Sequence, residues 1–477
     1  MTLFSLAVGE LASQEPDLPL SAKIHCSGCH QAPRPGSMTQ DAWEPTIQTM
    51  FEMAREKNVP VPTAPQFNEI VNFYVQNSPE KFRPVVDDLE ETKLKFEKMA
   101  VGSLPVNERP QATNVRICDL DSDGKEDDVV VTDNEHSTIS WLRLDESSGE
   151  WKETVLAKAP APVRTNIFDF DQDGDMDIAV AAMGFMHPND DLIGEFHLLI
   201  NRGDQTFEQK TVLRGTPRIT DIAPGDFDKD GDIDFVVAMF GWRKTGGIGY
   251  LEQKSPTEFT THPLLQINGT MRVMPAFVDD DDKLDFLALI TQEHETVAAF
   301  IQEKPGKFRN SILARANHPV FGSSGIQFVD LDGDGDKDLL YTNGDMMDEN
   351  PLPKPFHGVR WFENKDGEWV LHHLAEMPGC YCGTASDMDG DGDLDIVASA
   401  LYFHWDQNDF PSLIWLENTG GAKEFIRRKI AYAPTNLASH DVGDLNGDGL
   451  PDIVAAGMHI PGPLGRKGRL TVWLQKK

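Results

Sequence analysis

The residues best placed to do chemistry stand near the start of the chain, in the run Cys26-Ser27-Gly28-Cys29-His30. Two cysteines at this spacing form thioether bonds to the vinyl groups of a haem, and the histidine that follows binds the iron. A redox-active cysteine pair and half of a zinc site are the rival interpretations, but no second Cys-x-x-Cys pair or histidine-rich partner follows. We therefore expect a covalent c-type haem.

The sixth iron ligand must come from the far side of a pocket, and the elements that follow the motif predict such a pocket. Residues 41–55 and 65–75 both show apolar side chains at helical spacing. A methionine in the first of these helices would raise the haem potential relative to a second histidine. Met50 is the expected ligand, Met53 and Met38 are alternatives, and a methionine on an apolar face also suits a core position. The expected apolar faces are Trp43, Ile47, Met50 and Ala54 in the first helix, and Phe67, Ile70, Val71 and Tyr74 in the second.

This segment resembles the class I cytochrome c domain in its attachment motif, its middle helix with a late methionine, and its later helix with the aromatic pair Phe73-Tyr74. It departs from that family because no Met-Pro ligand loop stands late in the segment. The resemblance implies a small all-α haem domain at residues 21–78. The proline- and charge-rich residues 79–92 are expected to be a linker.

A second chemical pattern recurs along the rest of the chain. The run Asp387-Met-Asp389-Gly-Asp391-Gly-Asp393-Leu-Asp395 has counterparts that begin at residues 119, 169, 226, 277, 330 and 444. Alternating carboxylates with a turn glycine at the sixth place supply the hard oxygen ligands that Ca²⁺ prefers. An EF-hand is excluded because a strand, not a helix, follows and no glutamate stands at the twelfth place. Metal-free acidic turns are the alternative, but such close carboxylates repel one another without a cation.

Each repeat also predicts four strands, one before the acidic loop and three after it. Four strands at a period of about 50 residues are typical of β-propeller blades. The last repeat ends after its third strand, and residues 93–101 can supply the fourth and so close the ring. We expect an all-β seven-bladed propeller over residues 93–477, with an N-terminal strand that closes the last blade.

The acidic repeats resemble the FG-GAP and VCBS repeat family, the calcium-loop blades also found in integrin α-subunits. The fourth repeat departs from the pattern, with Phe277 at the first place and Asp282 at the turn, so its site is expected to be lost. By position, the resemblance implies these calcium ligands: Asp119, Asp121, Asp123 and Asp127; Asp169, Asp171, Asp173 and Asp177; Asp226, Asp228, Asp230 and Asp234; Asp330, Asp332, Asp334 and Asp338; Asp387, Asp389, Asp391 and Asp395; Asp444, Asn446, Asp448 and Asp452.

The face opposite the acidic loops is expected to carry the function. His187, His404 and His459 follow second strands, and Arg164 and Arg272 share one place in the first strands. A catalytic centre, a further transition-metal site or an anion-binding site would use these groups, whereas ordinary loop histidines and Asp-paired arginines are the plainer interpretation. Cys380 and Cys382 are interpreted either as ligands of copper or zinc or as two small buried thiols. Cys118 is expected to be a core residue.

Composition limits the possible functions. The chain has 477 residues and a formal net charge of −35, which disfavours nucleic acid and anionic membranes as partners. No apolar run approaches the roughly 20 residues of a membrane span. Residues 1–20 are interpreted as a signal-peptide remnant or a disordered terminus.

These observations predict an exported haem protein, periplasmic or extracellular, that acts in electron transfer with a redox partner protein. It would be an oxidoreductase or the electron-transfer module of an oxidoreductase. The sequence leaves open whether the protein is itself an enzyme. The alternative is a calcium-stabilised propeller that binds a small molecule, a glycan or a protein, with the cytochrome as an accessory.

Overall fold

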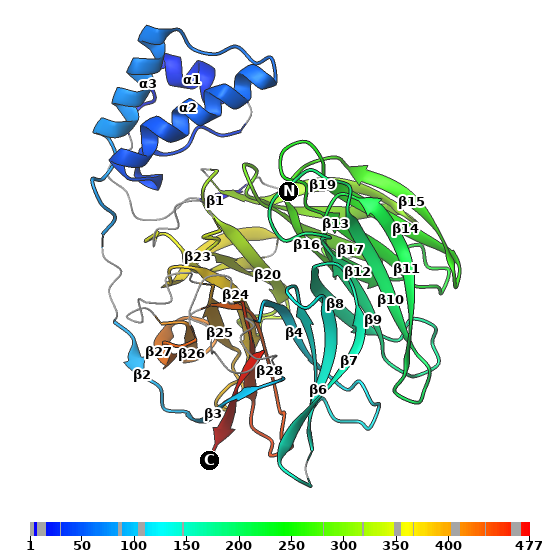
Figure 1. The fold of residues 1–477 in the computed structure, drawn as a ribbon. Helices are drawn as coiled ribbons and strands as arrows, with labels where there is room; N and C mark the ends of the chain where they lie inside the picture. Colours follow the sequence, from blue (N-terminus) through cyan, green and yellow to red (C-terminus); the bar gives the residue numbers. More distant parts are fainter. Residues whose placement is uncertain are drawn as a thin grey trace.

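The computed structural model describes residues 4–6, 16–28, 30–83, 88–103, 110–145, 147–279, 281–316, 319–347, 354–365, 367–401, 411–434, 436–458 and 469–477. Seven antiparallel sheets follow one another around a ring, and a small group of helices stands over one end of it (Figure 1). The predicted seven-bladed propeller is therefore confirmed. No helix of the described chain is both long and apolar enough to cross a membrane.

Each blade contains four strands from the centre of the ring outward, in sequence order in the first six blades. The first strands are β4 (Ala112–Cys118), β8 (Pro162–Phe168), β12 (Ile219–Gly225), β16 (Thr270–Ala276), β20 (Ser323–Val329), β24 (Cys380–Ser386) and β28 (Leu437–Gly443). The second strands are β5 (Asp128–Asp133), β9 (Asp177–Ala182), β13 (Asp234–Met239), β17 (Asp285–Ile290), β21 (Asp338–Asn343), β25 (Asp395–Ala400) and β29 (Asp452–Gly457).

The third strands are β6 (Thr138–Asp145), β10 (Gly194–Asn201), β14 (Gly247–Ser255), β18 (Thr296–Lys304), β22 (Gly358–Lys365), β26 (Leu413–Asn418) and β30 (Leu470–Lys476). The outer strands are β7 (Glu150–Lys158), β11 (Phe207–Thr216), β15 (Glu258–Leu265), β19 (Lys307–Ala316), β23 (Glu368–Glu376) and β27 (Phe425–Ala431), and in the seventh blade β3 (Lys95–Val101). β3 runs antiparallel to β30, from Lys95 opposite Lys476 to Val101 opposite Leu470.

Apolar side chains of the middle strands form one cluster between each pair of neighbouring blades. The second strands are buried along all or nearly all of their length, for example Asp395–Ala400, because both of their faces lie against other blades. Burial of this kind explains why these strands are apolar runs in the sequence and show no alternation.

The seven first strands share a local irregularity. In each one the pairing register with the second strand shifts after the first residue, for example between Cys380 and Cys382. The residues that resume the pairing are Asn114, Arg164, Asp221, Arg272, Gly325, Cys382 and Ser439. The repeat therefore places one residue per blade at an equivalent position on the innermost strand.

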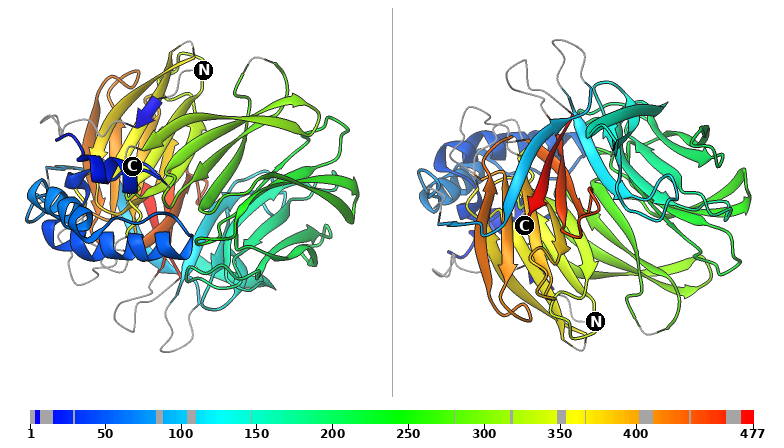
Figure 2. Two further views of the ribbon diagram at one scale, coloured as in Figure 1. Left: turned by 90° about the horizontal axis from the view of Figure 1, so that it is seen from above. Right: turned by 90° about the horizontal axis from the view of Figure 1, so that it is seen from below.

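The helical segment contains three α-helices, α1 (Leu20–His25), α2 (Gln40–Glu56) and α3 (Ala64–Gln76), and the single 3-10 turn Pro35–Ser37 within residues 16–28 and 30–83. The two predicted helices are confirmed to within one residue at each end, whereas α1 was not predicted. Trp43 of α2 stacks on Tyr74 of α3, with ring centroids 4.1 Å apart. Seen from above, the helices lie across one side of the ring (Figure 2).

Two short strands lie outside the predicted blades. β1 (Phe4–Leu6), from the segment interpreted as a signal remnant or disordered end, pairs in parallel with β19. β2 (Glu90–Glu91) pairs in parallel with β27. The expected linker is thus bound along the propeller: Arg83 forms an ion pair with Glu376, and Glu90 one of 3.0 Å with Arg428.

Candidate functional site

The acidic loops form compact clusters of carboxylates. In five loops, three carboxylate oxygens from different aspartates lie within 4.8 Å of one another, as in the group Asp387, Asp389 and Asp395. The chain turns sharply here because Gly390 and Gly392 have φ angles of 78° and 96°, in the left-handed region that favours glycine. The other groups are Asp119, Asp121 and Asp123; Asp169, Asp171 and Asp177; Asp226, Asp228 and Asp230; and Asp330, Asp332 and Asp338. Hard oxygen atoms gathered in this way suit Ca²⁺.

The aspartate at the ninth place of the loop has a second role. Asp395 is fully buried, and its two oxygens accept N–H groups from Met388 in the loop at 3.0 Å and from Asn418 at the end of the third strand at 2.7 Å. The same pair of backbone bonds is made by Asp177, Asp285, Asp338 and Asp452. This carboxylate clamps the loop to the blade.

Burial raises the pKa of these clamp carboxyls, to about 6 for Asp395 and Asp452, while the backbone N–H donors partly oppose that effect. A nearby cation would favour the ionised form, so the clamp and the ion cluster support each other.

In the first loop, the aspartate that clamps the loop to the blade is not the residue that the spacing of the other loops predicts. Asp128, and not Asp127, accepts the N–H of Leu120 at 2.9 Å and starts the second strand. The residue of this loop that is equivalent to Asp395 is therefore Asp128, and Asp127 as a calcium ligand stays a prediction. The physical reason is that this loop has one more residue between Gly124 and the strand.

The fourth loop keeps the clamp without an ion cluster. Asp285 accepts the N–H groups of Val278 and Gln302 at 3.0 and 2.7 Å. Among the residues that the structure describes here, Lys283 pairs with Asp281, and no group of three ligating side chains is found. The Lys283 ammonium occupies the neighbourhood of these carboxylates, where a calcium ion would otherwise bind. The loss of the calcium site in this loop stays a prediction. For the seventh loop, an ion site with Asn446 stays a prediction.

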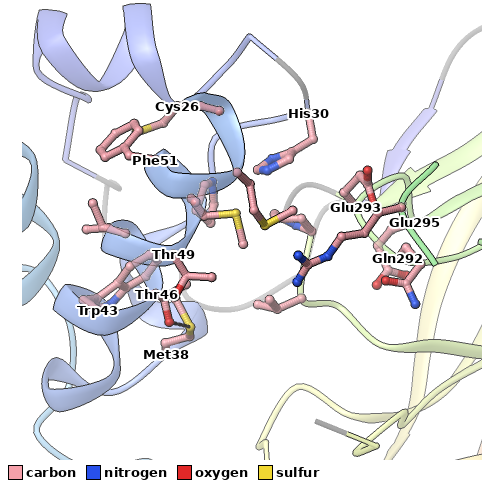
Figure 3. Close-up of a pocket in the computed structure, with 18 of the residues that line it drawn as sticks. Cys26, His30, Met38, Trp43, Thr46, Thr49, Phe51, Gln292, Glu293 and Glu295 are labelled. Atoms are coloured by element: carbon pink, nitrogen blue, oxygen red, sulfur yellow. Dashed lines mark hydrogen bonds between the residues drawn. The ribbon is translucent and has the colours of Figure 1, made fainter. Parts of the chain in front are cut away.

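Cys26 and His30 lie at the edge of a cavity of about 400 Å³ between the helices and the propeller (Figure 3). Half-buried Cys26 follows α1 directly. The Nδ1 of His30 lies 2.7 Å from the carbonyl oxygen of Gln31, which leaves Nε2 as the nitrogen for a metal. Cys29 lies outside the described residues, so the complete attachment motif stays a prediction.

The cavity wall contributed by the helices is mainly apolar. Trp43, Ile47, Phe51 and Tyr74 are buried members of this wall, and Met38, Met50 and Met53 line it as well. The predicted apolar face of α2 was wrong in one respect: Phe51 is buried, whereas Met50 is 42% exposed at the edge of the helix. All three candidate methionines thus border the same cavity as His30, and the choice among them stays open.

The residues present suit a bound haem. The Tyr74 hydroxyl lines the cavity and, within the part of the chain that the structure describes, is buried without a hydrogen-bond partner. A buried hydroxyl of this kind needs an acceptor. Burial raises the pKa of the Cys26 thiol to about 11, so this sulfur is uncharged at neutral pH.

The cavity wall contributed by the propeller is polar, and backbone hydrogen bonds hold its loop in place. A single carboxylate oxygen of Asp190 accepts four consecutive backbone N–H groups, from Trp242 to Thr245, at 2.9 to 3.1 Å. The Arg243 guanidinium lies over the Trp242 ring, 3.8 Å from its centroid. Both side chains line the cavity. The loop after β13 therefore holds a cation and an aromatic ring opposite His30.

A buried carboxylate completes this wall. Glu295 accepts N–H groups from Gly322 and Ser323, each at 2.9 Å, and a hydrogen bond from the Ser323 hydroxyl. Burial raises the pKa of Glu295 to about 7, against the effect of these donors. Sequence reasoning missed both Asp190 and Glu295, because their partners come from loops of neighbouring blades.

The residues predicted to act on the propeller face are only partly brought together. Arg164 pairs with Asp221 at 3.2 Å, as the structural interpretation of the arginines expected, and Arg272 is half-buried on β16. His187 is exposed, and its carbonyl accepts a bond from Arg218. His404 and His459 lie outside the described residues, so convergence of the three histidines stays a prediction.

Comparison with known proteins identifies the repeats. The FG-GAP-like repeat model matches residues 119–180, 169–237, 278–341 and 387–455, which together make up more than half of the chain. No curated protein matches the sequence. The matched segments contain the acidic loops and all or part of the second strand that follows each loop, and the chain therefore belongs to the FG-GAP-like repeat family.

Proposed function

We propose that this protein is a calcium-stabilised binding module that carries a c-type haem over its open face, and that it exchanges single electrons with a ligand or redox partner bound there. The observation that carries the proposal is the cavity of about 400 Å³ with His30 on one wall and Arg243 on the other. The face opposite the calcium loops is thus both a binding surface and the place of the haem segment.

The binding role rests on the propeller. FG-GAP-like repeats build the ring, and the rigid loop at Trp242 and Arg243 offers a cation and an aromatic ring to a ligand of the propeller. Such a pair suits an anionic or glycan partner. Of the two predicted functions, the family match favours this one.

The electron-transfer role rests on the residues around Cys26 and His30. A haem held by Cys26, Cys29 and His30 would supply one-electron transfer. His30 is oriented by its bond to the Gln31 carbonyl, Phe51 and Ile47 exclude water, and the Tyr74 hydroxyl is available to an acceptor. Covalent attachment of this kind accompanies export, so we also propose a periplasmic or extracellular location.

The test is the colour of the purified full-length protein. We expect an alkaline pyridine spectrum of c-type haem that survives acid-acetone extraction, and its loss in Cys26→Ala. Cys118→Ala is the matched control and should keep the spectrum, because that buried thiol lies in the propeller core. A colourless wild-type protein from a host that attaches haem would refute the haem role and leave the binding role.

The binding role has its own test. Arg243→Ala should weaken retention of the protein on an anionic glycan column while the melting temperature stays unchanged. Arg202→Ala, at an exposed ion pair with Glu208 on the far part of blade two, is the control. Equal retention of wild type and Arg243→Ala would place ligand binding elsewhere.

A further inference from the structure

A second cavity, of about 300 Å³, lies between loops of blades one and two. Its walls are the loop after β5, the loop after β9 and the turn before β8, so all of its described lining residues belong to the propeller. Each acidic loop joins a first strand to a second strand, so loops that follow second strands lie on the opposite, open face. This cavity shares no lining residue with the one beside His30.

An aromatic ring borders the second cavity and faces solvent. Phe185 is 54% exposed, and its ring centroid lies 5.4 Å from that of exposed His187. Single exposed apolar side chains are common on protein surfaces, so the exposure of Phe185 alone indicates no function. Its loop, however, is held in one conformation.

Two features fix the loop that carries this ring. Gly184 has a φ of 77°, and a Cβ atom there would lie 2.3 Å from the carbonyl oxygen of Ile193, so only glycine fits. The Arg218 guanidinium, which is 2% exposed, donates to the carbonyl oxygens of Met186 and His187 at 3.1 and 3.2 Å. The ring is therefore presented to a ligand without a further cost of ordering the loop.

A row of polar side chains forms the opposite wall. The Asn134 amide donates to the Gln111 Oε1 at 2.7 Å, and the Gln111 amide donates to the Glu135 Oε2 at 2.8 Å. Each amide nitrogen has a second hydrogen and the carboxylate a second oxygen, so the row can both donate and accept further bonds. A buried ion pair of 2.6 Å between Arg469 and Asp133 holds the base of this loop.

The backbone of these walls does not suit a peptide ligand. An extended peptide binds by pairing with free backbone groups at a strand edge. Here the N–H of Gly184 donates to the Pro160 carbonyl, and the N–H of Asn134 donates to the Gln111 carbonyl, both at 2.9 Å. Hydrogen bonds to a ligand must therefore come from the side chains of the polar row.

The charge of the cavity disfavours an anionic ligand. Among its described lining residues, Glu135 is the single carboxylate, and none is a lysine or an arginine. The formal net charge of the whole chain is −35, which adds to the repulsion of an anion. An uncharged ligand with many hydroxyl groups fits these walls better.

We propose that the second cavity binds an uncharged sugar unit of a polysaccharide. A pyranose ring has an apolar C–H face, which would lie on the Phe185 ring, and a rim of hydroxyls that both donate and accept, as the row of Gln111, Asn134 and Glu135 requires. This site is additional to the binding surface at Arg243, and the inference does not depend on the haem.

The first test is native electrophoresis of the full-length protein in gels that contain soluble neutral glucan, mannan, galactan or xylan. We expect at least one polysaccharide to retard the wild type, and Phe185→Ala to raise the dissociation constant at least about tenfold. Phe277→Ala is the matched control, because it removes a phenyl ring that is 61% exposed on the acidic-loop face, and it should keep the wild-type affinity.

Two outcomes of this test would overturn the proposal. One is that none of the four polysaccharides retards the wild type, and the other is that Phe185→Ala is retarded as strongly as the wild type. Retardation in a gel with denatured casein, and in none with polysaccharide, would assign the cavity to a peptide and refute the sugar.

The second test examines the polar row and the independence of the two cavities. Gln111→Ala and exposed Glu135→Ala should each weaken binding of the neutral polysaccharide about tenfold at an unchanged melting temperature, since sugar hydroxyls lose their partners. Wild-type affinity in both variants would refute the row as the hydroxyl-binding wall. Arg243→Ala should bind the neutral polysaccharide like the wild type. Its loss of that binding would place the sugar in the cavity beside His30 and overturn the second site.

Discussion

At the scale of single residues, the clamp aspartates decide how each acidic loop is held. Asp285 performs this task in a loop without an ion cluster, so the hydrogen bonds of the clamp can be separated from metal binding. In the fourth blade Lys283 also pairs with Asp281 inside the loop.

We predict that Asp285→Ala lowers the free energy of unfolding by about 2–4 kcal/mol, because two buried N–H groups lose their acceptor. The loss should be the same with calcium and with excess chelator, measured by denaturant unfolding. Asp282→Asn, at the exposed turn with a φ of 58° that asparagine tolerates, is the control and should change little. A calcium-dependent loss would mean that Asp285 binds an ion after all.

Glu295 gives a second prediction at this scale, from its pKa of about 7. The folded protein keeps a proton on this buried carboxyl that the unfolded chain releases at lower pH. Stability should therefore fall as the pH rises towards 7, and this part of the fall should be absent in Glu295→Gln. Between pH 5 and pH 8 the variant should gain at most about 3 kcal/mol on the wild type, at about 1.4 kcal/mol per pKa unit.

The measurement is denaturant unfolding at both pH values, with half-buried Glu293→Gln as the control from the same loop. Parallel pH dependences of wild type and Glu295→Gln would show that the Glu295 carboxyl is already ionised at pH 5.

At the scale of elements, the blades could be predicted from the sequence, whereas two short strands outside the blades could not. The repeat of the acidic loop predicted the blades, because loop and strands are contiguous and each blade is one local unit. Short parallel strands such as β1 and β2 could not be predicted, since their partners are remote and they carry no periodicity of their own.

The site was predictable to a similar degree. Cys26, His30 and the methionines were found because they stand close in sequence. The different burial of Cys380 and Cys382 depends on a register shift in β24 that no residue type predicts. Phe51, and not Met50, faces the core because the exact rotation of α2 is fixed by packing on α3.

The acidic loops give the prediction at the element scale. Asp171→Asn should lower the melting temperature in calcium, because this carboxylate belongs to the group with Asp169 and Asp177. In excess chelator, wild type and variant should melt together. Asp279→Asn, the third place of the fourth loop, should change neither melt. A loss for Asp171→Asn that persists in chelator would point to packing and not to an ion.

At the scale of the whole molecule, the ring depends on strands from the two ends of the propeller segment. Without β3, the strand β30 would expose an unpaired edge, and such edges promote aggregation. Two truncated chains test this dependence.

A chain that starts at Thr92 keeps β3 and should remain monomeric with a melting temperature close to that of the full protein. One that starts at Gln111 lacks β3 and should melt several degrees lower and aggregate, as measured by scanning calorimetry and size-exclusion chromatography. Equal behaviour of the two chains would show that the seventh blade does not need β3.

The contacts of the segment after the helices have a consequence for how the cavity is maintained. Phe82 packs against Phe356, and Arg83 pairs with Glu376, so the chain is tied to the propeller five residues beyond Ser78. A tether this short keeps the helical segment at an effective concentration of about millimolar beside the propeller face. A weak interface, too weak to hold two separate proteins together, is then enough to keep the cavity closed.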